Sequence, residues 1–305
     1  MGTPDFAAES LEKLYDSNHE IIGVVTNPDR PKGRGMKLAE SPVKEFAVLK
    51  NIPVYQPLKV KENEELLNDI KKMNPDVICV VAYGKILPKE ILEIPKYGCI
   101  NLHGSILPKY RGSAPIQWAV LNGDKKTGVT TIYMNEQMDA GDMILTRETE
   151  IGEYETTGEL WQRLSTIGAE LLLETIDRIE KGTAPRVPQE GDFTLAPMLN
   201  REMSKIDWNT SAKVIKNLVY GLNPIIGAYT MYDEKKIKIW KIEILDEIST
   251  EQPGSILESD DKKGLKIATR DNVISVTEIQ GENAKRMPIG DFLRGNKLEI
   301  GKVLK

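Results

Sequence analysis

The sequence predicts two domains: a doubly wound α/β domain with a mostly parallel sheet, followed by a small β-barrel. The chain has 305 residues, which is above the size at which a single hydrophobic core usually stops growing. Short β-branched runs alternate with amphipathic stretches in the first half, as in βα units around a parallel sheet. Beyond residue 205 the pattern becomes mainly strand-like, which favours a five- or six-stranded barrel.

The first domain is expected to span residues 1–183. Its predicted strands are residues 20–26, 53–56, 76–83, 98–104 and 128–134, with an extended stretch at 144–151. Its predicted helices are residues 4–17, 41–49, 63–73 and 114–121. A long helix is expected over 156–181, because apolar residues recur there at helical spacing and Gly182 follows as a stop.

The start of the chain resembles a strand-to-helix turn, with Thr3 as N-cap and Pro4 at the first helical position. A doubly wound sheet normally opens with a strand of about 5–6 residues before such a turn. We therefore expect the natural gene to encode a few apolar residues upstream of Met1.

A linker is expected over residues 184–204, where periodicity fades among prolines and glycine. The second domain, residues 205–305, is expected to begin with a helix and to end with a short one. The predicted helices are 211–222 and 289–294, and the predicted strands are 227–232, 236–245, 264–268 and 273–279.

Composition excludes several classes of protein. With 40% apolar and 29% charged residues the chain is globular rather than disordered. Two cysteines form neither a disulfide framework nor a zinc motif, so we expect a reducing compartment and no metal. No run approaches the roughly 18 apolar residues of a membrane span, and no signal peptide is evident, so we expect a cytoplasmic protein without a membrane partner.

The formal net charge of -5 argues against a general polyanion binder. The charge is unevenly distributed, however. Residues 201–305 hold 18 Lys and Arg against 16 Asp and Glu, a net charge of +2, so residues 1–200 carry -7. The second domain could therefore contact a nucleic acid, although the charge alone does not demonstrate it.

The most informative motif is NLHGSILPKYRG, residues 101–112. Side chains alternate along a strand, so Asn101 and His103 should share one face, near the strand end where ligands of α/β sheets gather. An Asn amide can donate to a developing oxyanion, and a His can act as general acid or base. The structural alternative is a histidine satisfied by a backbone carbonyl, with Asn101 capping a turn.

A second motif, MDAGDM at residues 138–143, contains Asp139 and Gly141. Such a pair is usual turn chemistry. A carboxylate is also what an active-site histidine needs to hold its tautomer and stabilise its cation. Spacing alone does not show that Asp139 reaches His103.

A third motif is the cationic run NPDRPKGRGMK, residues 27–37. Its prolines and glycines predict a long exposed loop without regular structure. The run could contact phosphates or could be a solvated surface loop; its four cations are Arg30, Lys32, Arg34 and Lys37. The glycines do not complete GxGxxG, and no Walker motif occurs, so a nucleotide cofactor is poorly supported.

These motifs, together with GTPDFA at residues 2–7 and VVAYGKILP at 80–88, closely resemble the methionyl-tRNA formyltransferase family, over nearly the whole chain. The NLHGSxLPxYRG element is shared by the wider group of formyltransferases that use 10-formyltetrahydrofolate. The resemblance implies a Rossmann-like catalytic domain, an OB-like tRNA-binding barrel and a catalytic set of Asn101, His103 and Asp139.

The resemblance also implies binding sites. The folate-binding residues would be Tyr83, Gly84, Ile86, Leu87, Ser105, Ile106, Leu107 and Pro108. Arg30, Lys32, Arg34 and Lys37 would contact the acceptor-stem region of the initiator tRNA. The formyl group of 10-formyltetrahydrofolate would pass to the α-amino group of methionyl initiator tRNA, in an enzyme that we expect to be a monomer.

Three alternatives stay open. A related enzyme could formylate an amino sugar or another small amine with the same catalytic trio. A nucleic-acid-binding protein without catalysis would use the loop and the barrel alone. A dinucleotide-dependent oxidoreductase would fit the βα pattern but lacks its glycine fingerprint.

Overall fold

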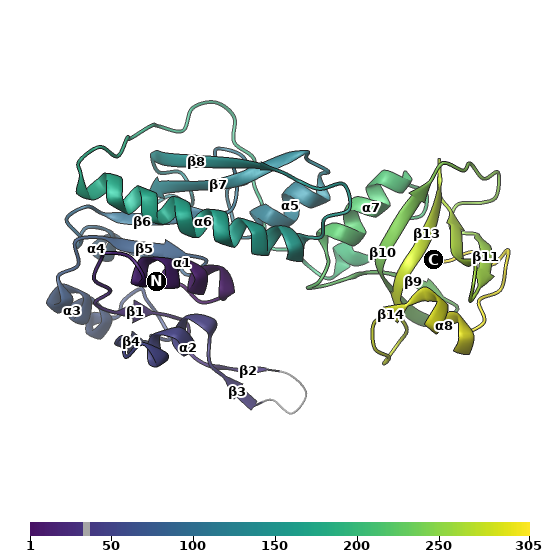
Figure 1. Ribbon diagram of the computed structural model, residues 1–305, viewed down its shortest axis with the longest axis horizontal. Coiled ribbons are helices and arrows are strands. Elements are labelled where there is room, and N and C mark those ends of the chain that lie inside the picture. The colour runs from purple at the N-terminus through teal and green to yellow at the C-terminus, as the bar shows by residue number, and fades with distance from the viewer. Residues whose placement is uncertain (33–36) are drawn as a thin grey trace. The chain divides into compact units, whose positions relative to one another are not determined.

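The computed structural model describes residues 1–32 and 37–305 (Figure 1). The chain forms two compact units. One contains residues 1–115, 126–150 and 161–197, and the other contains 116–125, 151–160 and 198–305. An α/β unit followed by a small barrel-like unit confirms the predicted fold class. No helix in the described part of the chain is both long and apolar enough to cross a membrane.

The first unit is built on short strands. Strands β1 (Val24–Val25) and β4 (Val54–Tyr55) pair in parallel. A four-stranded sheet has the order β5 (Ile78–Val81), β6 (Cys99–His103), β7 (Lys126–Tyr133) and β8 (Met143–Glu150). The β5–β6 pair is parallel, whereas β6–β7 and β7–β8 are antiparallel. Strand β6, which carries Asn101 and His103, is therefore parallel to β5 on one side and antiparallel to β7 on the other.

The helices of the first unit agree with the predicted periodicity. They are α1 (Asp5–Tyr15), α2 (Pro42–Leu49), α3 (Glu64–Met73) and most of α6 (Thr157–Glu180), with a short α4 (Lys89–Leu92) that the sequence did not predict. The predicted helix α5 (Pro115–Leu121) is also present and falls almost wholly in the second unit. Helix α6 runs along the sheet (Figure 1), where Thr175 hydrogen-bonds to Thr131 of β7 at 2.8 Å. Leu102 lies on the opposite face of β6 from Asn101 and packs against Gly168 of α6, where a Cβ would come within 2.8 Å of the leucine side chain.

Two local expectations were wrong. Thr3 does not cap α1: its Oγ1 accepts hydrogen bonds from the backbone and side-chain nitrogens of Asn27, so Pro4 precedes the helix without a side-chain cap. The cationic run is not devoid of regular structure, because β2 (Arg30–Lys32) and β3 (Lys37–Ala39) form an antiparallel hairpin. Pro31 is tolerated because a two-stranded ribbon leaves half of its amides without a strand partner.

The second unit is an antiparallel sheet. Its strand order is β11 (Ile256–Asp260), β12 (Gly264–Ala268), β13 (Val273–Gln280), β10 (Lys235–Leu245) and β9 (Ala228–Tyr232), with β14 (Met287–Pro288) beside β13. The unit also contains α7 (Ala212–Gly221), α8 (Ile289–Gly295) and a single 3-10 turn, Glu202–Ser204. Strands β11 and β14 were not predicted.

The C-terminal residues join the two edges of this sheet. The backbone of Lys305 exchanges hydrogen bonds with Met231 of β9, and Ile256 of β11 bonds to residues 301 and 302. The pairing makes the sheet barrel-like around a buried core that includes Trp208, Ile239 and Ile267. Open strand edges are aggregation hazards, and this closure covers them.

Candidate functional site

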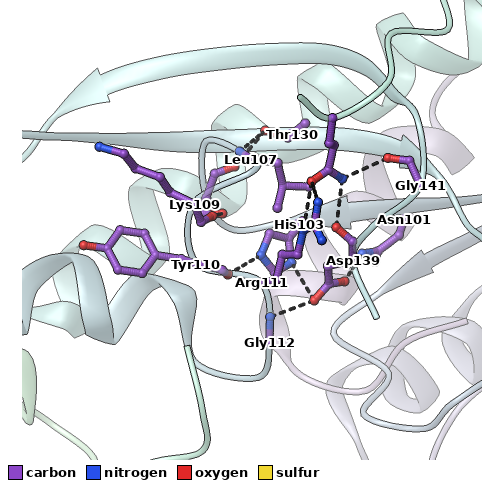
Figure 2. Close-up of polar contacts among 12 residues, drawn as sticks. Asn101, His103, Leu107, Lys109, Tyr110, Arg111, Gly112, Thr130, Asp139 and Gly141 are labelled. Atoms are coloured by element: carbon purple, nitrogen blue, oxygen red, sulfur yellow. Dashed lines mark hydrogen bonds and ion pairs between the residues drawn. The ribbon is translucent and has the colours of Figure 1, made fainter. Parts of the chain in front are cut away.

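Strand β6 places Asn101 and His103 on one face of the sheet, as strand alternation predicts (Figure 2). Both side chains lie against Asp139. The Asn101 Nδ2 donates to Asp139 Oδ1 at 3.2 Å, and His103 Nδ1 lies 3.6 Å from Asp139 Oδ2. The structure thus brings Asp139 to a strand residue that lies 38 positions earlier in the sequence.

Asp139 is held by its own backbone and by a second loop. Its φ of 51° lies in the left-handed region, which costs a non-glycine residue of the order of 1 kcal/mol or more. Gly141 makes the turn possible, because a Cβ there would overlap the carbonyl oxygen of Tyr133. The carboxylate Oδ2 accepts a hydrogen bond from the Gly112 amide at 2.9 Å. The side chain is 15% exposed, so one edge of this carboxylate is accessible to solvent.

The imidazole of His103 is fixed mainly by a backbone carbonyl. Its Nε2 lies 2.8 Å from the Tyr110 oxygen, so Nε2 carries the proton, and Nδ1 faces the Asp139 carboxylate. The sequence also allows a histidine that only bonds to a backbone carbonyl. That part of the alternative is confirmed, because the Tyr110 carbonyl is such a partner. The 3.6 Å separation on the Nδ1 side exceeds hydrogen-bond length, which leaves that nitrogen for a proton transfer.

The loop between His103 and Gly112 folds on itself. The buried hydroxyl of Ser105 donates to the Lys109 carbonyl at 2.6 Å. Thr130 of β7 donates to the Ser105 carbonyl at 2.7 Å and accepts from the Leu107 amide at 3.2 Å. These bonds return the chain so that the Tyr110 carbonyl points at the imidazole.

The segment before residue 198 forms one wall of the site. Arg111 and Ala114 exchange backbone hydrogen bonds with residues 194–196, at 2.8–3.1 Å. Gly112, with φ of 129°, lies so close to this segment that a Cβ would come within 2.6 Å of the Ala196 oxygen. A side chain at this position would push the segment away and displace the amide that holds Asp139.

Gln189 connects the two loops that carry the site. Its Oε1 accepts two hydrogen bonds from the Arg111 guanidinium, at 3.0 and 2.8 Å. Its Nε2 donates to the carbonyls of Asp139 and Gly141, at 2.8 and 2.9 Å. Sequence reasoning missed both Gln189 and the Tyr110 carbonyl. A glutamine in a stretch without periodicity, and a backbone oxygen, leave no recognisable pattern in a single sequence.

The predicted folate-binding residues differ in their exposure to solvent. Tyr83, Leu87, Ser105 and Leu107 are buried, whereas Gly84 and Ile86 are exposed and Ile106 and Pro108 are half-buried. The Tyr83 hydroxyl is buried without a hydrogen-bond partner in the described residues, and burial raises its pKa to about 12. Gly84 has φ of 72° with open space on its Cβ side.

Three of the four predicted phosphate-binding cations, Arg30, Lys32 and Lys37, belong to strands β2 and β3. Arg30 is exposed, and Lys32 and Lys37 pair across the hairpin through their backbones. Arg34 lies outside the described residues. Asp29, at the base of the hairpin, accepts hydrogen bonds from Lys44 at 2.6 Å and from Gln56 at 2.7 Å, and these bonds lower its pKa. Its charge is thereby paired with Lys44.

The other histidine is structural. His19 Nε2 lies 2.8 Å from Asp177 Oδ1 of α6, a partner that the sequence did not reveal. Within residues 1–32 and 37–305, no three His, Cys, Asp or Glu side chains gather closely enough to hold a metal ion. The imidazole available at the polar site is therefore that of His103.

Comparison with known proteins gives a consistent result over the whole chain. Residues 1–176 match the formyl transferase family, and residues 198–297 match the formyl transferase C-terminal domain. The chain is 54% identical to a methionyl-tRNA formyltransferase of Clostridioides difficile over 305 residues, which cover 100% of this chain and 98% of that one. It is 49% identical to a protein of the same name from Alkaliphilus oremlandii, with the same coverage.

Solved structures share the fold at low sequence identity. A sugar 3N-formyl transferase, WlaRD, has a TM-score of 0.67 at 18% identity, covering 90% of this chain and 95% of that chain. HypX from Aquifex aeolicus, solved with tetrahydrofolic acid, has a TM-score of 0.60 at 21% identity, covering 85% of this chain and 47% of that chain. At these identities the likeness concerns the fold alone.

Proposed function

This chain belongs to the formyl transferase family, and from that premise we propose that it formylates the α-amino group of methionyl initiator tRNA with 10-formyltetrahydrofolate as donor. One observation carries the choice of acceptor. Relatives at 46–54% identity over the full chain bear the name methionyl-tRNA formyltransferase, whereas the sugar N-formyltransferases are similar only in fold. The product is N-formylmethionyl-tRNA, which serves translation initiation in the cytoplasm.

The residues proposed for the folate fit a flat, polar group. The unpartnered Tyr83 hydroxyl is a buried polar atom that a bound ligand could satisfy. Gly84 leaves its surroundings open, and the exposed side chain of Ile86 offers apolar surface beside it. Ser105 and Leu107 would act by shaping the loop, because the structure uses the Ser105 hydroxyl and the Leu107 amide internally. When bound, the folate supplies the formyl group.

We propose that Asn101 and, once protonated, His103 stabilise the negative charge that develops on the formyl oxygen. The Asn101 amide has two N–H groups and spends one on Asp139, so the second can donate to that oxygen. The α-amine of an aminoacyl ester is nucleophilic when neutral, and the ordinary pKa of an α-amino group, about 7.7–8.0, leaves part of it neutral near pH 7. His103 Nδ1 can accept and return a proton while Tyr110 holds Nε2.

Asp139 orients this pair. Its two oxygens meet the Asn101 amide, the Gly112 amide and the imidazole, so that it fixes the carboxamide and offers a negative charge to a protonated His103. The cations of residues 27–37, Arg30, Lys32, Arg34 and Lys37, would contact tRNA phosphates, and the barrel-like second unit would bind further along the tRNA. We propose residues 1–183 and 205–305 as the domains, with residues 184–197 of the connecting stretch hydrogen-bonded to the catalytic domain, and a monomer as the working form.

A single assay separates the proposed acceptor from its alternatives. Formyl transfer from 10-formyltetrahydrofolate is measured with charged initiator tRNA, charged elongator tRNA, free methionine and a nucleotide-linked amino sugar. The proposal expects transfer to initiator methionyl-tRNA to exceed transfer to each other acceptor by at least about a hundredfold in kcat/KM. Faster transfer to the amino sugar, or no transfer to any tRNA, would refute it.

A further inference from the structure

A phenylalanine ring lies exposed at the edge of the polar site. The Phe193 side chain is 53% exposed, although the Cζ atom of Arg111 lies 4.6 Å from the centre of its ring. Single exposed apolar side chains are common and need no explanation by themselves. Phe193 differs from them because its surroundings hold it next to the proposed catalytic residues, with part of the ring surface still open to a ligand.

The backbone beside Phe193 is tied to the loop that supports the catalytic histidine. Thr194 Oγ1 accepts a hydrogen bond from the Tyr110 amide at 2.9 Å, and the Thr194 carbonyl accepts one from the Arg111 amide at 2.9 Å. Tyr110 also supplies the carbonyl that lies against His103 (Figure 2). Phe193 is therefore the neighbour of a residue that is bonded directly to the support of the imidazole.

Arg111 lies against the Phe193 ring and is itself fixed. Its guanidinium donates two hydrogen bonds to Gln189 Oε1, at 3.0 and 2.8 Å, and Gln189 Nε2 donates to the Asp139 carbonyl at 2.8 Å. A guanidinium beside an aromatic ring is attracted by the electrons of the ring. The ring and the guanidinium are thus presented together in a fixed arrangement, one side chain away from the backbone of Asp139.

The chemistry of these two groups fits a nucleobase. Unpaired bases of RNA are bound by stacking on aromatic rings and on guanidinium planes. Glu190 and Asp192 lie on the same segment as Phe193 and are exposed. Their negative charges disfavour a phosphate at this place. The ligand that suits Phe193 and Arg111 is therefore a flat group without a negative charge.

We propose, on the basis of the function proposed above, that Phe193 backed by Arg111 is a stacking platform for the unpaired 3′-terminal adenine of charged tRNA. In an aminoacyl-tRNA the amino acid is esterified to the ribose of that nucleotide, so its base must lie close to the site that receives the α-amine. Asn101, His103 and Asp139 form that site, and the stacking platform lies at its edge. Stacking would hold the ester in position while the amine reacts.

The stacking platform contributes affinity and orientation rather than a choice among tRNAs. Every tRNA ends in the same adenosine, so Phe193 should strengthen the binding of initiator and elongator tRNA alike. The folate is the other flat ligand of the proposed reaction. Most of the residues that we propose for it lie in other segments, residues 83–87 and 105–108, which leaves the ring of Phe193 for the tRNA.

The test uses the full chain and an initiator tRNA that carries 2-aminopurine in place of its terminal adenine, because the fluorescence of this base falls when it stacks. Phe193→Leu keeps apolar bulk but removes the aromatic face, and Phe193→Tyr keeps that face. Val187→Ala is the matched control, since it shortens an exposed side chain of the same segment. Tm checks that each variant folds.

We expect the parent, Phe193→Tyr and Val187→Ala to quench the fluorescence, and Phe193→Leu to lose at least about half of the quenching. The Kd of the tRNA should rise by at least about fivefold in Phe193→Leu, as expected for the loss of one stack between a base and an aromatic ring. The same rise should be seen with elongator tRNA.

Two results would overturn the stacking platform. Equal quenching by the parent and Phe193→Leu would show that the base does not stack on this ring. A higher KM for the folate with an unchanged Kd for tRNA would show that the ring contacts the folate instead. Failure of the proposed function is seen separately, in formyl transfer by the parent. A parent that formylates no tRNA, yet quenches the terminal base through Phe193, would keep the stacking platform and lose the proposed reaction.

Discussion

Gln189 offers the sharpest test of how the site is held in place. Replacing it with alanine removes two hydrogen bonds to the loop that carries Asp139 and the acceptor for Arg111. Each lost hydrogen bond costs about 0.5–1.5 kcal/mol, so the two bonds to the Asp139 loop contribute about 1–3 kcal/mol. If that energy positions the site in the transition state, kcat should fall by about tenfold to a hundredfold. The KM for the folate should change little.

Gln189→Glu separates the two functions of this side chain. A glutamate keeps an acceptor for Arg111 but presents an oxygen, instead of an N–H, to the Asp139 and Gly141 carbonyls. We expect it to be at least as impaired as Gln189→Ala. Single-turnover formyl transfer measures the effect, with Tm as the test of folding and Gln137→Ala, an exposed residue near the Asp139 loop, as the matched control. A fully active Gln189→Glu would show that the contact to Arg111 suffices and that the tie to the loop does not matter.

The remaining predictions concern the proposed roles of single residues. Asn101→Ala and His103→Ala should each lower kcat by at least about a hundredfold with Tm preserved, and near-normal turnover would remove that residue from the mechanism. Arg34→Ala should weaken the use of charged tRNA and reduce its salt dependence while folate binding stays unchanged; an equal loss of both would contradict the phosphate-contact assignment. Burial raises the pKa of Tyr83 to about 12, whereas an unfolded chain releases this proton near pH 10, so stability should fall between these values as pH rises. In urea unfolding at pH 8 to 11.5, Tyr83→Phe should show a shallower decline than the parent; parallel curves would contradict the burial argument.

Sequence periodicity was sufficient for the elements that place the site. Alternation along residues 98–104 put Asn101 and His103 on one face, and both contact Asp139 in the structure. Periodicity could not predict that β7 and β8 are antiparallel, because the pattern of a strand does not depend on the direction of the strand. Residues 20–23 read as strand, yet only Val24–Val25 is paired, since a strand needs a partner as well as a pattern. The roles assigned to the folate and tRNA residues stay predictions.

The rest of the site depends on contacts between distant segments. Tyr110 acts through a backbone oxygen that any residue would provide, so its identity carries no signal. Gln189 lies 50 residues from Asp139 in sequence, in a region that reads as a linker. Loops with internal hydrogen bonds, such as residues 104–112, show no regular spacing of apolar residues. Their conformation can be predicted only once the positions of the strands on either side are known.

Residues 194–196 pair through their backbones with Arg111 and Ala114. This pairing determines where the gene can be cut without damage to the catalytic domain. A truncation after residue 183 would delete Gln189 and strip a hydrogen-bonded edge from the loop that holds Asp139. A truncation after Pro197 keeps both, in agreement with the compact unit that ends there. In a domain exchange between relatives, the crossover point should therefore follow Pro197, so that each catalytic loop keeps the stretch of chain against which it is hydrogen-bonded.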